Sequence, residues 1–215
     1  VYGKPTGKKV IYRVIADCLV RDNKVIEEWI IRDEKSILNQ LGIKTYDYVK
    51  QKIKEGIYTK NDTNLIKNCF TIKNKIPVCE SKNTNKYKNY FLKIIKDQSN
   101  IYHLYERSAQ LYWIGGEVIY TFDQIFEKWK LFLSCFNISK CEISNNISLS
   151  QKNMRPRTSM RWRLICKHSQ NGIFGTPTNK DVEIFGISHA EFGKNGIIRE
   201  FILIDEISIW KQILL

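Results

Sequence analysis

The chain has 215 residues, of which 43% are hydrophobic and 12% aromatic, and this composition excludes a disordered or collagen-like polypeptide. Its 35 basic and 22 acidic residues give a net charge of +13, but the lysines are scattered through the sequence, which disfavours a nucleic-acid-binding patch. No apolar run approaches the roughly 20 residues that a membrane helix needs, so no membrane partner is expected.

The six cysteines are Cys18, Cys69, Cys79, Cys135, Cys141 and Cys166. They form no CxxC pair and no spacing typical of a metal site, and the chain carries no recognisable export signal. The sequence therefore predicts reduced cysteines, a cytoplasmic location, no metal and no organic cofactor. The chain opens on Val1 rather than methionine, which suggests that an upstream portion is absent.

In chain order, the first elements are two strands at residues 9–20 and 25–31, joined by a tight polar turn. A helix is expected to follow Asp33, with Ile37, Leu38 and Leu41 on its apolar face. Residues 44–88 are dominated by Lys, Asn, Thr and Asp and are interpreted as a connector.

The remainder of the chain predicts helices before strands. One or two helices are expected in residues 90–111, a further helix at 122–136 and a strand at 159–167. A hairpin with strands at 181–192 and 197–204 leads into a closing helix. This order indicates an α+β fold with an antiparallel sheet.

An internal repeat relates the two ends of the chain. The first forty residues recur near the C-terminus with a constant offset of 172 and no gap. Identical pairs include Gly3 and Gly175, Pro5 and Pro177, Glu28 and Glu200, Asp33 and Asp205, and Gln40 and Gln212. Because a turn, two strands and a helix start recur in the same order, the chain is predicted to hold two copies of one module.

Several segments carry a resemblance to a known family. They are residues 160–168, 174–178, 186–189 and 195–201, together with Asp205. Over residues 3–42 and 88–215 the chain resembles the SnoaL-like, polyketide cyclase-like branch of the nuclear transport factor 2-like superfamily. The resemblance implies a cone-shaped α+β roll, in which a curved antiparallel sheet wraps around helices and an apolar pocket opens at its mouth.

The resemblance also implies a domain layout. Residues 1–43 would be the C-terminal half of a first, truncated SnoaL-like domain, residues 44–88 a connector, and residues 89–215 a complete SnoaL-like domain. The two copies are expected to pack on each other within the chain, or the protein to form a homodimer.

Polyketide cyclases of this branch use a His and an Asp in the pocket, and His189 and Asp205 fall at the matching positions. On regular strands His189 shares one face with Ile187, and Asp205 shares one face with Leu203, so one apolar lining would hold both polar groups. Burial there would raise the pKa of the carboxyl and suit it to acid–base work on a small apolar, oxygenated substrate. The expected substrate-binding residues are His168, Trp129, Phe185, Phe201 and Leu203.

The same residues have structural interpretations. Asp205 and Asp33 each stand where a strand gives way to a helix, the place of an N-cap, and a lone His in an apolar strand is commonly a core residue. The alternative function is therefore a noncatalytic ligand-binding or dimerisation module. If Trp129, Trp162 or Phe201 fills the cavity, the catalytic interpretation fails.

In the first copy Asp17 takes the place of His189, so that Asp17 and Asp33 form the equivalent pair. Paired carboxylates resemble the epoxide hydrolases of the superfamily, which also need an arginine. Arg13 lies four residues from Asp17 where the pattern requires two. Elsewhere, Arg161 and Arg163 either bind an anionic group of a substrate or lie on a solvated face.

Overall fold

A computed structural model describes residues 2–63 and 81–215 of the chain. The main sheet has six strands in the order β4-β3-β8-β7-β6-β5. Their bounds are β3 Tyr105–Tyr112, β4 Val118–Tyr120, β5 Phe136–Leu149, β6 Arg157–His168, β7 Asp181–Phe192 and β8 Ile197–Ile204. All neighbours pair antiparallel except β3 and β8, which run parallel.

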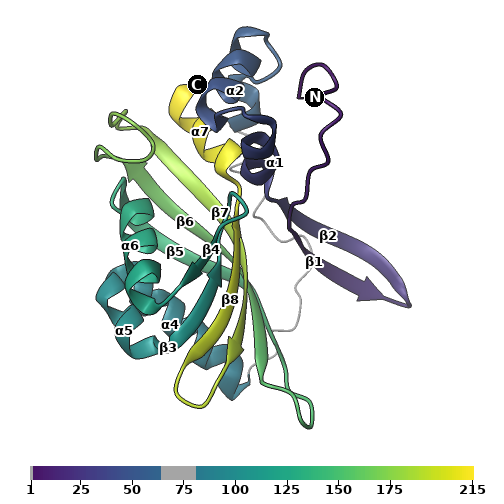
Figure 1. Ribbon diagram of the computed structural model, residues 1–215, viewed down its shortest axis with the longest axis vertical. Helices are drawn as coiled ribbons and strands as arrows, with labels where there is room; N and C mark the ends of the chain where they lie inside the picture. The colour runs from purple at the N-terminus through teal and green to yellow at the C-terminus, as the bar shows by residue number, and fades with distance from the viewer. Residues whose placement is uncertain (1, 64–80) are drawn as a thin grey trace.

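Helices cover one face of this curved sheet, here called the inner face. They are α4 (Lys82–Lys96), the short η1 (Gln98–Asn100) and α5 (Ile101–Leu104), and α6 (Phe122–Leu133), gathered on one side in Figure 1. Trp162 of β6 meets Phe91 of α4 with ring centroids 5.0 Å apart, and Phe91 meets Trp129 of α6 at 6.0 Å. The space between sheet and helices is therefore an aromatic core.

The N-terminal part forms a separate small sheet. Strands β1 (Val14–Arg21) and β2 (Lys24–Arg32) make a two-stranded hairpin followed by α1 (Glu34–Leu41) and α2 (Thr45–Lys54). Figure 1 shows this purple hairpin projecting on the side of the main sheet away from α4–α6, while α1 and α2 lie beside the C-terminal helix α7 (Glu206–Leu214). We call β1, β2 and α1 the hairpin unit, and β7, β8 and α7 the C-terminal unit.

The hairpin unit and the C-terminal unit share their strand register. Ile15 pairs with Ile31 as Ile187 pairs with Leu203, and every Cα pair of the first hairpin except Arg21 with Lys24 has its counterpart 172 residues later. The irregularity between Leu19 and Val20 recurs between Glu191 and Phe192. The repeat in the sequence thus corresponds to a repeat in backbone structure, including a β-bulge.

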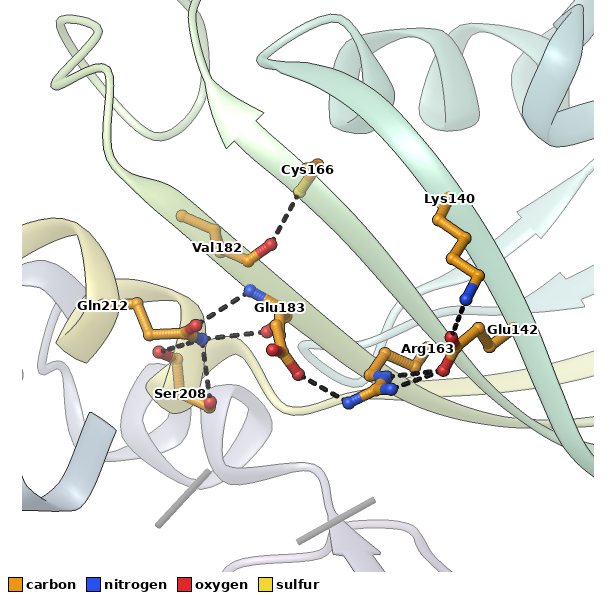
Figure 2. A network of polar contacts seen from close by, with 8 residues as sticks. All are labelled: Lys140, Glu142, Arg163, Cys166, Val182, Glu183, Ser208 and Gln212. Carbon is orange, nitrogen blue, oxygen red and sulfur yellow. Dashed lines mark hydrogen bonds and ion pairs between the residues drawn. The ribbon is translucent and has the colours of Figure 1, made fainter. Parts of the chain in front are cut away.

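Side-chain contacts recur with the same offset. The Gln212 amide bonds the backbone N–H and C=O of Glu183, both at 2.8 Å, and also the carbonyl of Ser208 (Figure 2). Gln40 makes the equivalent bonds to Ile11, at 2.9 and 2.8 Å, and to Ser36. The glutamine thus links the closing helix to the first strand of the hairpin in the C-terminal unit, and to the residues just before that strand in the hairpin unit.

Several element predictions are confirmed, among them both hairpins, the strand near residues 159–167 and the helix that begins at residue 122. Residues 105–112 were expected to be helical but form the strand β3, because Tyr105 and Leu111 face the core at the period of a strand. The expected connector contains the helix α2, and α4 already begins at Lys82. Part of that connector, with Cys69 and Cys79, lies outside the described residues. No helix in the described ranges is long and apolar enough to cross a membrane.

Candidate functional site

His189 and Asp205 lie on one face of the sheet, as their spacing predicted, but it is the outer face. His189 pairs with Phe201 across β7 and β8, and the backbone N–H of Asp205 bonds the carbonyl of Phe185 at 3.1 Å. The neighbouring inner-face positions, such as Ser188 and Ile202, point toward the helices and are fully buried. Neither side chain enters the interior of the cone.

The two residues also line different pockets. Asp205 lines a pocket of about 240 Å³ between β2 and the main sheet, together with Trp29, Phe185 and Arg161. His189 lines a second, more open pocket of about 440 Å³ with Phe201. The structure therefore does not bring this predicted pair to a common point where both could act on one substrate.

Asp205 serves as the N-cap of α7. Its carboxylate accepts the backbone N–H of Ser208 at 3.0 Å. Burial raises the pKa of Asp205, while the Ser208 bond opposes this. Burial lowers the pKa of His189, with Asp17 acting in the other direction. The pKa of Asp205 is thus raised, as predicted, but the residue is the N-cap of a helix.

The other predicted binding residues are dispersed. Trp129 and His168 are completely buried on the inner side, and Leu203 is buried on β8. Phe201 stacks on Tyr112 with centroids 4.3 Å apart and lines the pocket of His189, whereas Phe185 lines the pocket of Asp205. Burial lowers the pKa of His168. These five residues do not surround one cavity.

In the hairpin unit, Asp17 and Asp33 have separate partners as well. Asp17 accepts from the side-chain amide of Asn145 at 2.7 Å and lies 3.5 Å from Nε of Arg161. The arginine next to Asp17 is thus Arg161 of the main sheet. Arg13 instead donates to the carbonyls of residues 113 and 117, at 3.0 and 2.9 Å.

Asp33 joins the hairpin unit to the main sheet. Its carboxylate caps α1 through Ser36 N–H at 3.1 Å and accepts the consecutive backbone N–H groups of Gly115 and Gly116 at 2.7 and 2.9 Å. Both glycines have positive φ, 85° and 76°, and a Cβ at Gly116 would lie 2.9 Å from Oγ of Ser36. The glycine pair therefore allows the turn to approach α1 closely.

The interior of the cone holds a polar cluster that sequence reasoning missed. Glu200 accepts hydrogen bonds from the hydroxyls of Tyr87, at 2.6 Å, and Tyr105, and Nε1 of Trp162 donates to Ser188 at 2.7 Å. Burial raises the pKa of Glu200 to about 7, although the two tyrosine bonds lower it. The exact match of Glu28 to Glu200 in the repeat was the available signal for this position.

This cluster is closed. Tyr87, Trp129 and Trp162 are fully buried, and Glu200 is 1% exposed. Trp129 and Trp162 are two of the three residues named in the sequence analysis as excluding catalysis if they fill the cavity. The aromatic core leaves Glu200 as a buried, hydrogen-bonded carboxyl group inside the fold.

Arg161, which lines the pocket beneath β2, is a buried arginine with incomplete hydrogen bonding. Its side chain is 4% exposed, its Nε donates to Ser144 Oγ at 2.9 Å, and its Cζ lies 4.3 Å from the ring centroid of Trp29. Nη1 and Nη2 are buried and make no hydrogen bond with any described residue. By contrast, Arg163, two residues along the strand, is paired with Glu142 and Glu183 (Figure 2).

No group of three or more His, Cys, Asp or Glu side chains within residues 2–63 and 81–215 is arranged to hold a metal ion. The cysteines of this part of the chain are free thiols, at Cys18, Cys135, Cys141 and Cys166.

The architecture of this chain is similar to that of several solved structures. A candidate SnoaL-like polyketide cyclase from Jannaschia sp. CCS1 matches 66% of this chain and 97% of its own, with a TM-score of 0.50 and 8% identity. The chain has the fold of SnoaL-like proteins. IdmH, a candidate polyketide cyclase from Streptomyces antibioticus, matches 63% of this chain and all of its own, with a TM-score of 0.50 and 10% identity.

TsrD from Streptomyces laurentii gives the same result, with a TM-score of 0.50, 7% identity, and coverage of 63% of this chain and 98% of its own. No family model matches the sequence, and no curated protein does. At such low identity the SnoaL-like likeness concerns the fold, so the chemistry of this chain has to be argued from its own residues.

Proposed function

We propose that this SnoaL-like protein binds a small, flat, neutral molecule carrying an acceptor oxygen, in the pocket between β2 and the outer face of the main sheet. Binding rather than acid–base catalysis is the function, because His189 and Asp205 line different pockets and the interior is filled by Trp129 and Trp162.

The observation that carries the proposal is the state of Arg161. A guanidinium has five N–H donors, and here both terminal nitrogens are buried without a hydrogen-bond partner among the described residues. A buried donor left unsatisfied costs about 1–3 kcal/mol, so a ligand oxygen that accepts from Nη1 or Nη2 gains this energy on binding. Arg161 and the pocket it lines therefore suit an oxygenated ligand.

The rest of the lining favours a flat, apolar body. Trp29 provides an aromatic ring, and Phe185 and Ile187 add apolar surface from β7. The volume of about 240 Å³ limits the ligand to a small molecule. A ring system placed against Trp29 and Phe185 would bury its apolar surface and present one oxygen to Arg161.

The local charges favour a neutral ligand over an anion. Asp17 lies 3.5 Å from Arg161 Nε and balances its charge, and Asp205 also lines the pocket. A carboxylate ligand would be repelled by these two carboxyl groups, whereas a ketone or ester oxygen accepts a hydrogen bond without adding charge.

The test uses three probes of similar shape: α-tetralone, which has a carbonyl, tetralin, which lacks it, and α-naphthoate, which is anionic. Binding to the full chain is measured by calorimetry and by NMR shifts of the Trp29 indole. We expect α-tetralone to bind at least 10-fold more tightly than the other two, as one charge-assisted hydrogen bond of about 1.5–3 kcal/mol implies.

Arg161→Met should reduce the affinity for α-tetralone to that for tetralin. Arg163→Met is the matched control, because Arg163 lies on the same strand and face but does not line the pocket. Ile31→Trp, which fills the pocket from β2 and keeps Arg161, should abolish binding and guards against a folding defect in Arg161→Met. Equal binding of tetralin and α-tetralone, or tightest binding of α-naphthoate, would overturn the proposal.

A further inference from the structure

The hairpin unit exposes the face that its repeat partner buries. The face away from the main sheet carries Val14, Ala16, Cys18, Ile26, Glu28, Ile30 and Arg32, and all seven are exposed. The opposite face, with Ile15, Asp17, Trp29 and Ile31, is buried or half-buried toward the main sheet. We call the exposed set the free hairpin face.

Comparison at the offset of 172 shows what this exposure means. Ile30 is 46% exposed, whereas its counterpart Ile202 is 0% exposed. At the bulge, Val20 and Val25 are 58% and 57% exposed, whereas their counterparts Phe192 and Ile197 are 3% and 0% exposed. The backbone and register are shared, so the difference is what covers the face.

In the C-terminal unit the cover is the front half of the SnoaL-like domain, residues 82–172. Tyr87 and Tyr90 of α4 each place a ring 6.1 Å from that of Phe192, and Tyr87 donates to Glu200. The same front half supplies β3 beside β8 and β6 beside β7. In the hairpin unit, no strand formed by residues 2–63 or 81–215 pairs with the outer edges of β1 and β2.

We propose that the free hairpin face and the outer edges of β1 and β2 dock a polypeptide with the build of a SnoaL-like front half, namely helices followed by strands. Its first helix would lie over Val20 and donate a hydrogen bond to Glu28, as α4 does at Phe192 and Glu200, and the added front half would bury Ile30, whose counterpart Ile202 is buried. Its strands would extend the two-stranded sheet on both sides. Of the free hairpin face, Ile30 also lines the rim of the Arg161 pocket, whereas the other members do not, so the docking proposal is tested at Cys18 rather than through ligand binding.

Unpaired edges and an exposed apolar face support a docking role on physical grounds. An open edge with exposed apolar residues is a template for pairing with another chain, and proteins ordinarily protect such edges. Among described residues the hairpin has a charged tip, Arg21 to Lys24, and its free face is otherwise apolar except for Glu28 and Arg32. Burial of Ile30, Val20 and Val25 would supply the hydrophobic part of the binding energy.

The test gives the full chain the front half that the repeat specifies. A second copy of residues 82–172, carrying Cys141→Ser so that the original Cys141 stays unique, is joined directly ahead of Val1, because the offset places Val1 at the position of Ile173. The readout is the rate of maleimide labelling at Cys18, which lies on the free face and is exposed, measured by mass spectrometry beside Cys141 as an internal reference. We expect the extension to slow labelling at Cys18 at least 10-fold and to leave Cys141 unchanged.

Two variants of the extended chain check the contact. Ile30→Lys should restore fast labelling at Cys18, whereas Leu131→Lys, at an exposed apolar position of α6, should not. Unchanged labelling of Cys18 in the extended chain refutes the proposal, whether the added residues fold elsewhere or stay unfolded. A dimer of the unextended chain that protects Cys18 and is broken by Ile30→Lys would also refute it, since the occupant would then be a second copy.

Discussion

Replacing Asp33 by alanine is expected to weaken both a helix and the junction between the hairpin unit and the main sheet. Asp33 is 1% exposed and accepts three backbone N–H groups, from Ser36, Gly115 and Gly116. Loss of the cap on α1 costs about 1 kcal/mol, and a donor left unsatisfied at Gly115 costs about 1–3 kcal/mol. Gly116 is exposed, so water replaces its bond at little cost. The expected loss is therefore about 2–4 kcal/mol.

The internal repeat supplies the matched control. Asp205 caps α7 with the same geometry, but Ser208 N–H is its one hydrogen-bond donor among the described residues. Asp205→Ala should cost about 1 kcal/mol, the value of an N-cap alone. The difference between the two variants then isolates the contribution of the glycine turn.

The measurement is the free energy of unfolding in urea for the wild type and both variants, at one pH and with the slopes compared. If Asp33→Ala costs no more than Asp205→Ala, the bonds from Gly115 and Gly116 contribute nothing to stability and the junction has been misjudged. An unchanged slope ensures that the comparison concerns stability rather than the extent of unfolding.

Three further predictions concern the cone and its closing helix. Burial raises the pKa of Glu200 from 4.5 to about 7, so the folded state binds a proton more tightly than the unfolded state. The free energy of unfolding should therefore fall by about 3 kcal/mol as the pH rises from 4.5 to 7. Glu200→Gln should remove that part of the pH dependence, and an unaltered profile in urea unfolding would contradict the assignment. Gly186→Ala should destabilise the fold by about 1–3 kcal/mol or more, because a Cβ there overlaps the ring of Trp162. In a double-mutant cycle, Trp162→Leu should recover part of this loss, whereas additive effects would show that the overlap is not the cause. Gln212→Leu should lower the free energy of unfolding, measured by thermal unfolding, by about 2 kcal/mol. Gln40→Leu should cost less, because Gln212 is buried whereas Gln40 makes part of its hydrogen bonds to the exposed residue Ile11. Equal losses would show that burial does not matter here.

The repeat made both hairpins and their closing helices predictable, although β1 begins at Val14 rather than at residue 9. The alignment of residues 9–20 with 181–192 predicts the two closing helices, and the strand-to-helix boundaries indicate the caps at Asp33 and Asp205. The strand at residues 105–112 was not found, because its polar positions are interrupted by aromatic residues in a pattern that also suits a helix.

The candidate site was harder to predict for a physical reason. Spacing placed His189 and Asp205 on one apolar face, but it could not say which face the helices cover. Phe185 and Ile187 point outward and are nonetheless apolar, because the hairpin unit packs over this side of β7. A sheet covered on both sides loses the alternation that separates inside from outside.

The position of the hairpin unit has a consequence for synthesis of the chain. Its partners, Arg161, Phe185 and α7, are made late, about 130 to 180 residues after Asp33. At ordinary elongation rates of about 5–20 residues per second, these partners are synthesised roughly 6 to 36 seconds after the hairpin. During that interval both faces of β1 and β2 are open to solvent, so a nascent chain exposes Trp29 and Ile31 along with the free face, and α7, the last helix to be synthesised, then packs against α1 and α2.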